Sequence, residues 1–257
     1  MQVYAGLPIL TGAASAEEQA QLEHRLLGFV PITESFSVGE YMPLAHAEVD
    51  AALEAGRRPL VVGGTGLYLR AALTDLDLRP PPDPALRAQI HARMESEGPE
   101  ALRAEVLRRA PGATIAPGDR NRIIRYLELL EMGETTDPGP DLWTSETRHP
   151  TTLAGLVMDR DALVEKIDTR MEAIAAAAGD EVRAADAAGA SETARKAVGF
   201  SELLDGDVEA MKLRARQFAR RQMTWMRKLA GVNVIDVTRR DPSEVAAAIV
   251  RLVPPPA

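Results

Sequence analysis

The stretch PLVVGGTGLYLRAAL, residues 59–73, indicates the fold class more clearly than any other part of the chain. Its apolar, partly β-branched residues 60–62 predict a short buried strand, and the glycines at 63, 64 and 66 predict a sharp turn. The apolar spacing over 67–73 predicts a helix after that turn. Such a unit places backbone N–H groups and the Thr65 hydroxyl at the carboxyl edge of a parallel sheet, where α/β proteins bind ligands.

Composition limits the classes of protein and of site. With 257 residues, 46% of them apolar and 26% charged, the chain is long enough for one large or two smaller globular domains. It contains no cysteine, which excludes disulfides, thiolate metal sites and cysteine nucleophiles. Its four histidines show no metal-ligand spacing, so the residues themselves predict no metal site. The sequence shows neither a membrane-spanning apolar run nor a signal peptide, so we expect a cytoplasmic protein with no membrane partner.

The basic charge is concentrated in one segment. A formal net charge of -8 argues against a protein that coats nucleic acid by bulk electrostatics. Residues 211–235 nevertheless contain no acidic side chain, and their cations are Lys212, Arg214, Arg216, Arg220, Arg221, Arg227 and Lys228. This segregation favours a local phosphate-binding surface on one helix.

Apolar spacing and capping signals predict the other elements. Ser37 caps an expected helix over 38–55. Strands are expected over 153–158 and 233–237, and helices over 85–96, 99–109, 119–132, 161–187, 195–205, 208–229 and 241–252. The proline run at 80–84 is a stiff break that indicates a domain boundary. We therefore expect a parallel α/β core of residues 1–80 and 141–257, with a helical insertion domain of residues 81–140.

Several segments in matching order resemble the tRNA dimethylallyltransferase (isopentenyl-tRNA transferase) family. Besides the glycine turn, they are MQVYAGL (1–7), SVGEY (37–41), DRNRIIRYLE (119–128), RKAVGFSEL (195–203) and RQFARRQMTWMR (216–227). The resemblance covers nearly the whole chain. It implies a nucleoside-kinase-like P-loop fold, a magnesium ion (Mg2+) and a chain that we expect to be a monomer. The implied reaction transfers a dimethylallyl group from dimethylallyl diphosphate to N6 of the adenosine next to the anticodon (position 37).

The resemblance also implies roles for individual residues. Arg170, Arg216 and Arg220 would contact the diphosphate, and Thr65 would contact the flipped nucleotide in a catalytic role it shares with Arg170. The residues implied to contact the tRNA anticodon stem-loop are Gln2, Thr65, Arg87, Asn121, Arg122, Ile123, Ile124, Arg125, Lys196, Ala197, Val198, Gly199, Phe200 and Ser201. From the residues alone, Ile123 and Ile124 are expected to pack inward, and Phe218 and Trp225 to anchor the core.

Plainer interpretations stand beside these roles. Arg170 could be an exposed helix arginine paired with Glu165 or Glu172. The Thr65 hydroxyl could satisfy the N–H groups of its own turn, and Gly199 could form a tight turn between helices.

The chain departs from the family pattern at its front. It contains no G-x-x-x-x-G-K-[ST] motif, because none of its lysines follows a glycine. In the family that phosphate loop, and the aspartate that acts as general base, precede the segment that MQVYAGL matches. We therefore expect that a strand-loop-helix unit of roughly 30 or more residues is missing and that the chain alone is inactive. The alternatives are a fragment of a normal enzyme, a non-catalytic RNA-binding module that keeps the stem-loop contacts and, more remotely, a nucleotide-kinase relative.

Overall fold

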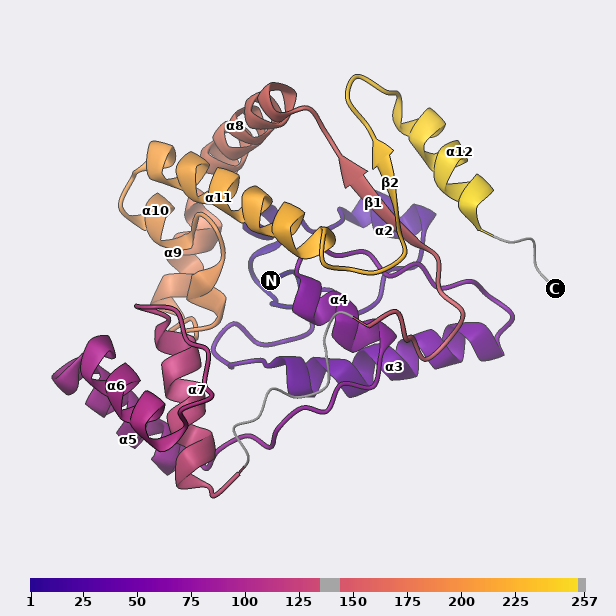
Figure 1. Ribbon diagram of the computed structural model, residues 1–257. Helices are drawn as coiled ribbons and strands as arrows, with labels where there is room; N and C mark the ends of the chain where they lie inside the picture. Colours follow the sequence, from indigo (N-terminus) through magenta and orange to yellow (C-terminus); the bar gives the residue numbers. More distant parts are fainter. Residues whose placement is uncertain (135–143, 254–257) are drawn as a thin grey trace. The chain divides into compact units, whose positions relative to one another are not determined.

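The computed structural model describes residues 1–134 and 144–253, and it divides into two units (Figure 1). Unit 1 consists of Met1–Asp75 and Trp143–Ala257, and unit 2 of Leu76–Leu142. The sequence predicted this division at 80/81 and 140/141. The described residues form a mostly helical α/β structure with a small parallel sheet.

The first part of unit 1 contains α1 (Pro8–Thr11), α2 (Ala16–Gln21), α3 (Val38–Glu54) and α4 (Gly66–Leu73). The predicted start of α3 at Ser37 is confirmed by a complete capping box. The Ser37 hydroxyl accepts a hydrogen bond from the Glu40 N–H, and the Glu40 carboxylate accepts one from the Ser37 N–H at 2.8 Å. The predicted helix after the glycine turn is confirmed as α4.

The sheet of unit 1 consists of β1 (Leu153–Val157) and β2 (Val232–Asp236), which pair in parallel with Gly155 opposite Val234. Both strands confirm the predictions for 153–158 and 233–237. The helix α12 (Pro242–Leu252) lies next to β2 (Figure 1). A further parallel bridge joins Tyr4 to Val30 outside the named strands.

The predicted buried strand at residues 60–62 is wrong. These residues form no strand, and their amides make no backbone hydrogen bond within the described part of the chain. Leu60 is 74% exposed and Val62 is 83% exposed. An apolar, β-branched run becomes a strand only where a neighbouring strand pairs with it, and β1 and β2 pair with each other instead.

The remaining helices of unit 1 are α8 (Arg160–Ala177), α9 (Gly179–Ala187), the 3-10 helix Ala194–Lys196, α10 (Phe200–Leu204) and α11 (Val208–Met226). The predicted single helix over 161–187 is wrong, because α8 ends before Ala178 and a second helix, α9, begins at Gly179, a poor helix former. The predicted single helix over 195–205 is also wrong. Gly199 has a φ of +97°, which no continuous right-handed helix accommodates.

The apolar core of unit 1 is formed by helices and by the first residues of the chain. It includes Leu7, Val182, Phe200 and Met211, and it contains no residue of β1 or β2. The helices α8 and α11 pack side by side in opposite directions. Two ion pairs show this: Glu172 pairs with Lys212, and Asp168, one turn earlier in α8, pairs with Arg216, one turn later in α11. The core therefore lies among the helices rather than on the sheet.

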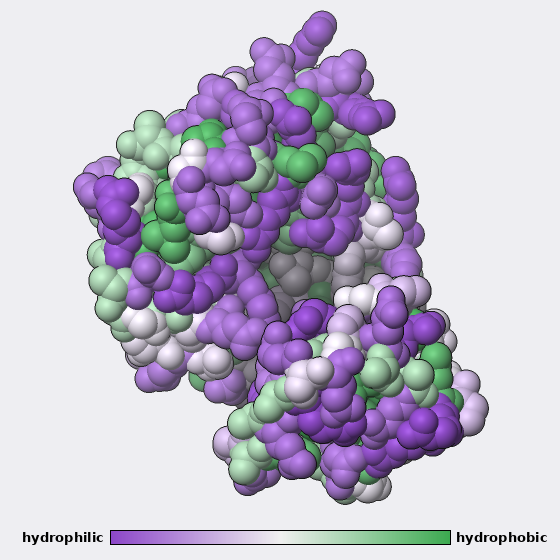
Figure 2. Space-filling view, turned by 90° about the vertical axis from the view of Figure 1, so that its left-hand side faces the viewer, coloured by the Kyte–Doolittle hydropathy of each residue, from purple (hydrophilic) through white to green (hydrophobic). Residues whose placement is uncertain are grey.

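Unit 2 is a bundle of three helices, α5 (Pro84–Glu97), α6 (Pro99–Arg109) and α7 (Arg120–Glu131). All three confirm the helices predicted from apolar spacing. They share one buried cluster formed by Ile90, Met94, Leu102, Val106, Ile115, Ile123, Ile124 and Leu127. Hydrophilic residues predominate on the face of the molecule that Figure 2 shows.

Candidate functional site

The glycine turn is seated directly on α11. A Cβ atom at Gly64 would overlap the side-chain amide of Gln222, and one at Gly66 would overlap the indole ring of Trp225. Gly66 therefore needs glycine because the rigid indole ring lies against it, whereas the flexible end of Gln222 could move away from a side chain at residue 64. Trp225 and Phe218 are only half-buried, so their predicted role as core anchors is wrong. The two sequence segments most strongly singled out, the turn and the basic helix, meet at this junction.

Thr65 lies between those two glycines and is the N-cap residue of α4. Its side chain is exposed and accepts no capping hydrogen bond, while its carbonyl accepts from the Leu69 N–H at 3.0 Å. The hydroxyl therefore does not satisfy the turn's own N–H groups, and its donor and acceptor positions face outward.

Arg170 and Gln2 converge on Gly12, at the end of α1. Gly12 adopts a left-handed φ of +58°, and a Cβ atom there would overlap the Arg170 guanidinium. The Gln2 amide donates to the carbonyl oxygens of Gly12 at 2.9 Å and Thr11 at 3.3 Å. Arg170 is exposed and pairs with no carboxylate in the described ranges, and Glu172 is instead bonded to Lys212. The expected pairing of Arg170 with Glu165 or Glu172 is therefore not found.

Arg216 and Arg220 lie one turn apart on α11 in different surroundings. Arg216 forms a two-point ion pair with Asp168 of α8, with its Nε 2.8 Å from one carboxylate oxygen. This hydrogen bonding raises the pKa of Arg216 and lowers the pKa of Asp168. Arg220 is exposed, and its guanidinium has no hydrogen bond or ion pair within residues 1–134 and 144–253. Arg220 is thus the more accessible of the two for an anionic ligand.

The segment KAVGFS, residues 196–201, is tied to α11 by Arg214. Its guanidinium donates to the Lys196 carbonyl at 2.9 Å and to the Glu202 carboxylate at 2.8 Å. Burial acts to raise the pKa of Glu202, but the hydrogen bonds from Arg214 and from backbone N–H groups outweigh it and lower that pKa. A Cβ atom at Gly199 would meet Met211 and Leu10, which supports the tight-turn interpretation of this glycine. Ala197 and Phe200 are buried, Val198 is half-buried, and Lys196 and Ser201 are exposed.

In unit 2, some of the residues implied to contact RNA are buried and others are exposed. Ile123 and Ile124 belong to the core of the bundle, as their inward packing predicted, so their side chains are not available to RNA. Asn121, Arg122 and Arg87 are exposed, and Arg125 is half-buried. Arg87 and Arg125 share one buried carboxylate, Glu128.

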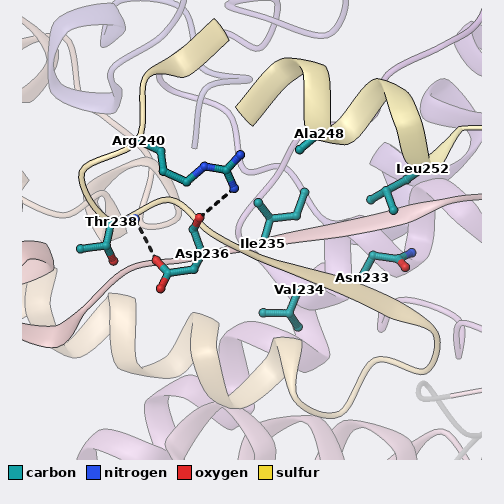
Figure 3. A pocket seen from close by; sticks show the side chains of 8 residues that line it. All are labelled: Asn233, Val234, Ile235, Asp236, Thr238, Arg240, Ala248 and Leu252. Atoms are coloured by element: carbon teal, nitrogen blue, oxygen red, sulfur yellow. Dashed lines mark hydrogen bonds between the residues drawn. The ribbon is translucent and has the colours of Figure 1, made fainter. Parts of the chain in front are cut away.

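Among the described residues, those implicated by the sequence form no metal-ligand group and line no part of the cavity between β2 and α12. Among residues 1–134 and 144–253, no three His, Asp or Glu side chains lie together as a metal-ligand group, so these residues assign no site to Mg2+. A cavity of about 570 Å³ lies between β2 and α12, where Ile235, Ala248 and Leu252 line it together with polar residues such as Asp236 and Arg240 (Figure 3). It contains no residue that the sequence implicated.

Sequence reasoning missed several residues that organise these sites. Gln222 was overlooked although it stands between the arginines and the tryptophan of the basic helix. Asp168 lies two residues before Arg170. No local sequence pattern indicated its ion pair, because its partner Arg216 is distant in sequence. Glu128 offered a usable signal, since it is a charged residue between Leu127 and Leu129 on the apolar face of α7.

No helix in the described ranges is both long and apolar enough to cross a bilayer.

The family model for IPP transferase matches residues 2–229. The chain is 36% identical to a tRNA dimethylallyltransferase of Thermobifida fusca over 266 residues, which is 97% of this chain and 82% of that protein. It is also 36% identical to one of Kineococcus radiotolerans, over 99% of this chain and 84% of that protein.

Solved structures agree with the sequence relatives. The tRNA isopentenylpyrophosphate transferase of Bacillus halodurans superposes with a TM-score of 0.68 and 30% identity, covering 97% of this chain and 83% of the other. A eukaryotic dimethylallyltransferase acting on tRNA has the same fold, with a TM-score of 0.73 and 20% identity over 98% of this chain and 70% of the other. The chain therefore belongs to the IPP transferase family, whose matched relatives are tRNA dimethylallyltransferases, a class of prenyl-transferring enzymes.

Proposed function

We propose that this chain binds a tRNA anticodon stem-loop and serves the transfer of a dimethylallyl group from dimethylallyl diphosphate to N6 of the adenosine next to the anticodon. The observation that carries the proposal is the seating of the glycine turn on α11. That junction brings the turn that carries the exposed Thr65 hydroxyl to the helix that also carries Arg216 and Arg220. A hydroxyl and guanidinium groups on two adjoining elements suit a nucleotide and a phosphate group.

In the proposed reaction the adenosine amine attacks the allylic carbon of the donor. A C–N bond forms, the C–O bond to the diphosphate breaks, and the diphosphate leaves with the electron pair while the amine proton passes to a base. Arg170 and Arg220 are suited to stabilise the leaving diphosphate, because both are exposed cations that no carboxylate neutralises in the described ranges. The flipped adenine would lie near Thr65 and Gln2. If Mg2+ is bound, it would neutralise diphosphate charge.

We further propose that the 257-residue chain does not catalyse the transfer alone. Its sequence contains no phosphate loop, and the family's general base has no counterpart in it. The exposure of Leu60 and Val62 supports this proposal, since the segment that leads into the glycine turn lacks a strand partner among the described residues.

The test is a prenyl-transfer assay with dimethylallyl diphosphate and an anticodon stem-loop RNA. The 257-residue chain is compared with a chimera that carries, before Met1, the strand and G-x-x-x-x-G-K-[ST] loop of a relative. The control is the chimera with the loop lysine changed to alanine, which removes the phosphate contact but keeps the added strand.

We expect transfer by the chimera alone. Transfer by the 257-residue chain would overturn the proposal that it lacks a necessary part. If neither protein transfers the group but both bind the stem-loop, the alternative of a non-catalytic RNA-binding module is the better account. If neither binds the RNA, the proposed function itself is wrong.

A further inference from the structure

The guanidinium group of Arg216, on α11, is held along one edge only. Its Nε donates to one oxygen of Asp168 at 2.8 Å, and its Nη2 donates to the other oxygen. A guanidinium group carries five N–H donors in a rigid, planar fork. Nη1 and the second hydrogen of Nη2 therefore form another two-point edge. No hydrogen bond or ion pair reaches that edge within residues 1–134 and 144–253.

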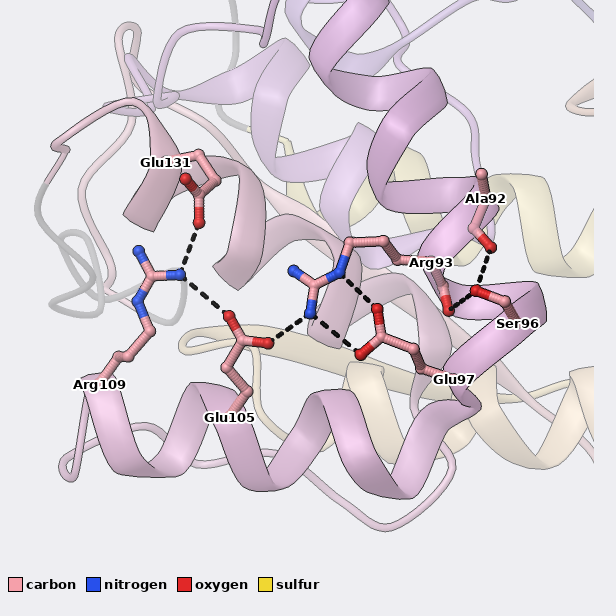
Figure 4. A network of polar contacts seen from close by, with 7 residues as sticks. All are labelled: Ala92, Arg93, Ser96, Glu97, Glu105, Arg109 and Glu131. Atoms are coloured by element: carbon pink, nitrogen blue, oxygen red, sulfur yellow. Dashed lines mark hydrogen bonds and ion pairs between the residues drawn. The ribbon is translucent and has the colours of Figure 1, made fainter.

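Two other arginines that hold a carboxylate by two points have no such open edge. Arg93 holds Glu97 through Nε and Nη2, but its Nη2 also donates to Glu105 at 2.6 Å (Figure 4). Arg148 holds Asp50 through Nη1 and Nη2, and its Nε lies 3.3 Å from the carboxylate of a second aspartate. In both cases a second carboxylate takes part of the edge that a ligand would need. These two arginines connect parts of the fold to each other.

The surroundings of Arg216 are open to solvent on one side. Its side chain is 33% exposed. Arg220 lies one turn later on α11, is exposed, and its guanidinium has no partner in the described part of the chain. Residues four apart lie on the same helix face, and residues 211–235 contain no acidic side chain. A phosphate group at this face of α11 would therefore meet an oriented guanidinium group and a second cation.

A second ion-paired group joins the same two helices and shows what a purely structural contact looks like. The Lys212 ammonium lies 2.7 Å from Glu172 of α8 and 2.7 Å from Glu209 of α11. The Lys212 side chain is only 11% exposed, so it offers little to a ligand. The contact of α8 with α11 therefore does not depend on Asp168 alone.

Charge alone gives Asp168 no reason to stand beside a phosphate site. Its carboxylate neutralises Arg216, and Glu209 adds a second negative charge close enough to raise the pKa of Arg216. Both carboxylates weaken the attraction of this face for anions. What Asp168 contributes is order, because its two-point contact fixes the plane and the direction of the guanidinium group.

We propose that Asp168 is a positioning residue that orders Arg216 so that the open Nη1–Nη2 edge receives a substrate phosphate group by two-point contact. The inference rests on the proposed function, since it takes that phosphate from the anticodon stem-loop or from the donor diphosphate. A long arginine side chain loses rotamer freedom when it binds, and one that is already ordered avoids much of that loss. The planar fork also matches the geometry of phosphate.

Asp168→Asn tests this role in the 257-residue chain. Affinity for an anticodon stem-loop RNA is measured by fluorescence anisotropy, and affinity for inorganic pyrophosphate by titration calorimetry. The variant is nearly isosteric, but it loses the negative charge and one of the two acceptor oxygens. If Asp168 acted only through its charge, the variant would bind both probes more tightly. If Asp168 positions Arg216, the variant binds roughly two- to tenfold more weakly the probe whose phosphate contacts Arg216.

The two probes distinguish the two sources of phosphate. A loss of affinity confined to the stem-loop assigns the open edge of Arg216 to the RNA backbone. A loss confined to pyrophosphate assigns it to the donor diphosphate. Either result supports the positioning role of Asp168.

Glu172→Gln is the matched control, because it removes the same charge from α8 one turn away. Its partner Lys212 keeps Glu209, and the ion pair of Arg216 is unchanged. We expect this variant to bind both probes at least as tightly as the unmodified chain. A loss equal to that of Asp168→Asn would show that the effect arises from the contact between α8 and α11, and it would overturn the positioning role.

A double-mutant cycle tests whether Asp168 acts through Arg216. Arg216→Ala should weaken binding of the same probe, and adding Asp168→Asn should then cause no further loss. Additive losses would contradict the proposal. Thermal unfolding shows whether each variant is folded. If Asp168→Asn does not fold, Arg216→Lys decides: it keeps the charge but has no second edge, so affinity should fall a few-fold, and an unchanged affinity would overturn the role.

Equal or tighter binding of both probes by Asp168→Asn, with the unmodified chain binding normally, would overturn the positioning role alone. Failure of the unmodified chain to bind either probe would overturn the proposed function and the inference together.

Discussion

The two units differ in how completely their apolar residues are covered. In unit 2, every helix contributes to one closed cluster, and residues such as Leu102, Ile123 and Leu127 are fully buried. In unit 1, apolar side chains are exposed on the strands, at Leu156 and Val234, and in the segment before the glycine turn, at Leu60 and Val62; some helix residues such as Leu213 are exposed as well. The difference teaches that the described helices of unit 2 cover their own apolar residues, whereas unit 1 leaves apolar residues uncovered, among them both strands of the parallel sheet near which α/β proteins place phosphate chemistry.

The largest effect is expected in the core of unit 2. Leu127→Ala should lower the free energy of unfolding by about 2–5 kcal/mol, because it leaves a cavity in a closed cluster. The same substitution at exposed Leu60 should change it by no more than about 0.5 kcal/mol. Chemical denaturation of both variants measures the contrast. Comparable losses of unfolding free energy in the two variants would mean that residue 60 is buried in solution, and they would contradict the difference between the units.

The second-largest loss of stability is expected at the junction between the glycine turn and α11. Gly66→Ala places a methyl group in the Trp225 ring and should cost about 1–3 kcal/mol, although alanine normally favours a helix. Gly63→Ala is the control, because no atom lies within 4 Å of the added Cβ and its φ is not left-handed. We expect that variant to be neutral in thermal unfolding. A neutral Gly66→Ala would show that the turn does not rest on the helix.

A smaller effect on stability should distinguish Arg216 from Arg170, two of the arginines proposed to contact the diphosphate. Arg216→Ala should lower the urea midpoint by a small amount, since it leaves Asp168 without its ion pair. Arg170→Ala should have almost no effect on stability, because Arg170 has no carboxylate partner in the described ranges. Both are measured by urea denaturation. An equal loss for Arg170 would assign it a structural role rather than a ligand role.

The smallest effect concerns pH. Hydrogen bonds from Arg148 and then His149 lower the pKa of Asp50 to about 2, which ties residues 148–149 to α3. Because this pKa is depressed in the folded state, the contribution of Asp50 is complete above about pH 4 and is lost as the pH falls toward 2. Asp50→Asn should therefore be less stable at pH 5, with the difference closing toward pH 2. A difference that stays constant with pH would contradict this ion pair.

Local sequence signals predicted the parts of the fold that local physics determines. The capping box at Ser37 and the apolar spacing of α5, α6 and α7 depend on residues three or four positions apart, and those helices formed as expected. The strand at 60–62 depended on a partner elsewhere, and its β-branched residues could not supply one. The break at Gly199 was visible as a glycine, but the close packing of this residue against Met211 was not.

The candidate site was less predictable, because its contacts join distant residues. The turn at 64–66 and the helix at 222–225 were each identified from sequence, but their direct contact was not. Arg87 and Glu128 are 41 residues apart, so no spacing rule could link them. The pairing of Arg216 with Asp168 similarly required the opposite directions of α8 and α11.

Hydrogen–deuterium exchange of the 257-residue chain tests the central contrast most directly. The Ile123 amide donates to the Asp119 carbonyl at 3.0 Å inside a closed core, whereas the amides of residues 60–62 have no hydrogen-bond partner in the described structure. We expect strong protection along α7 and exchange at the rate of an unstructured peptide over residues 60–62. Protection of residues 60–62 equal to that of α7 would show that this segment is a paired strand, and it would contradict the account of an apolar segment without a strand partner.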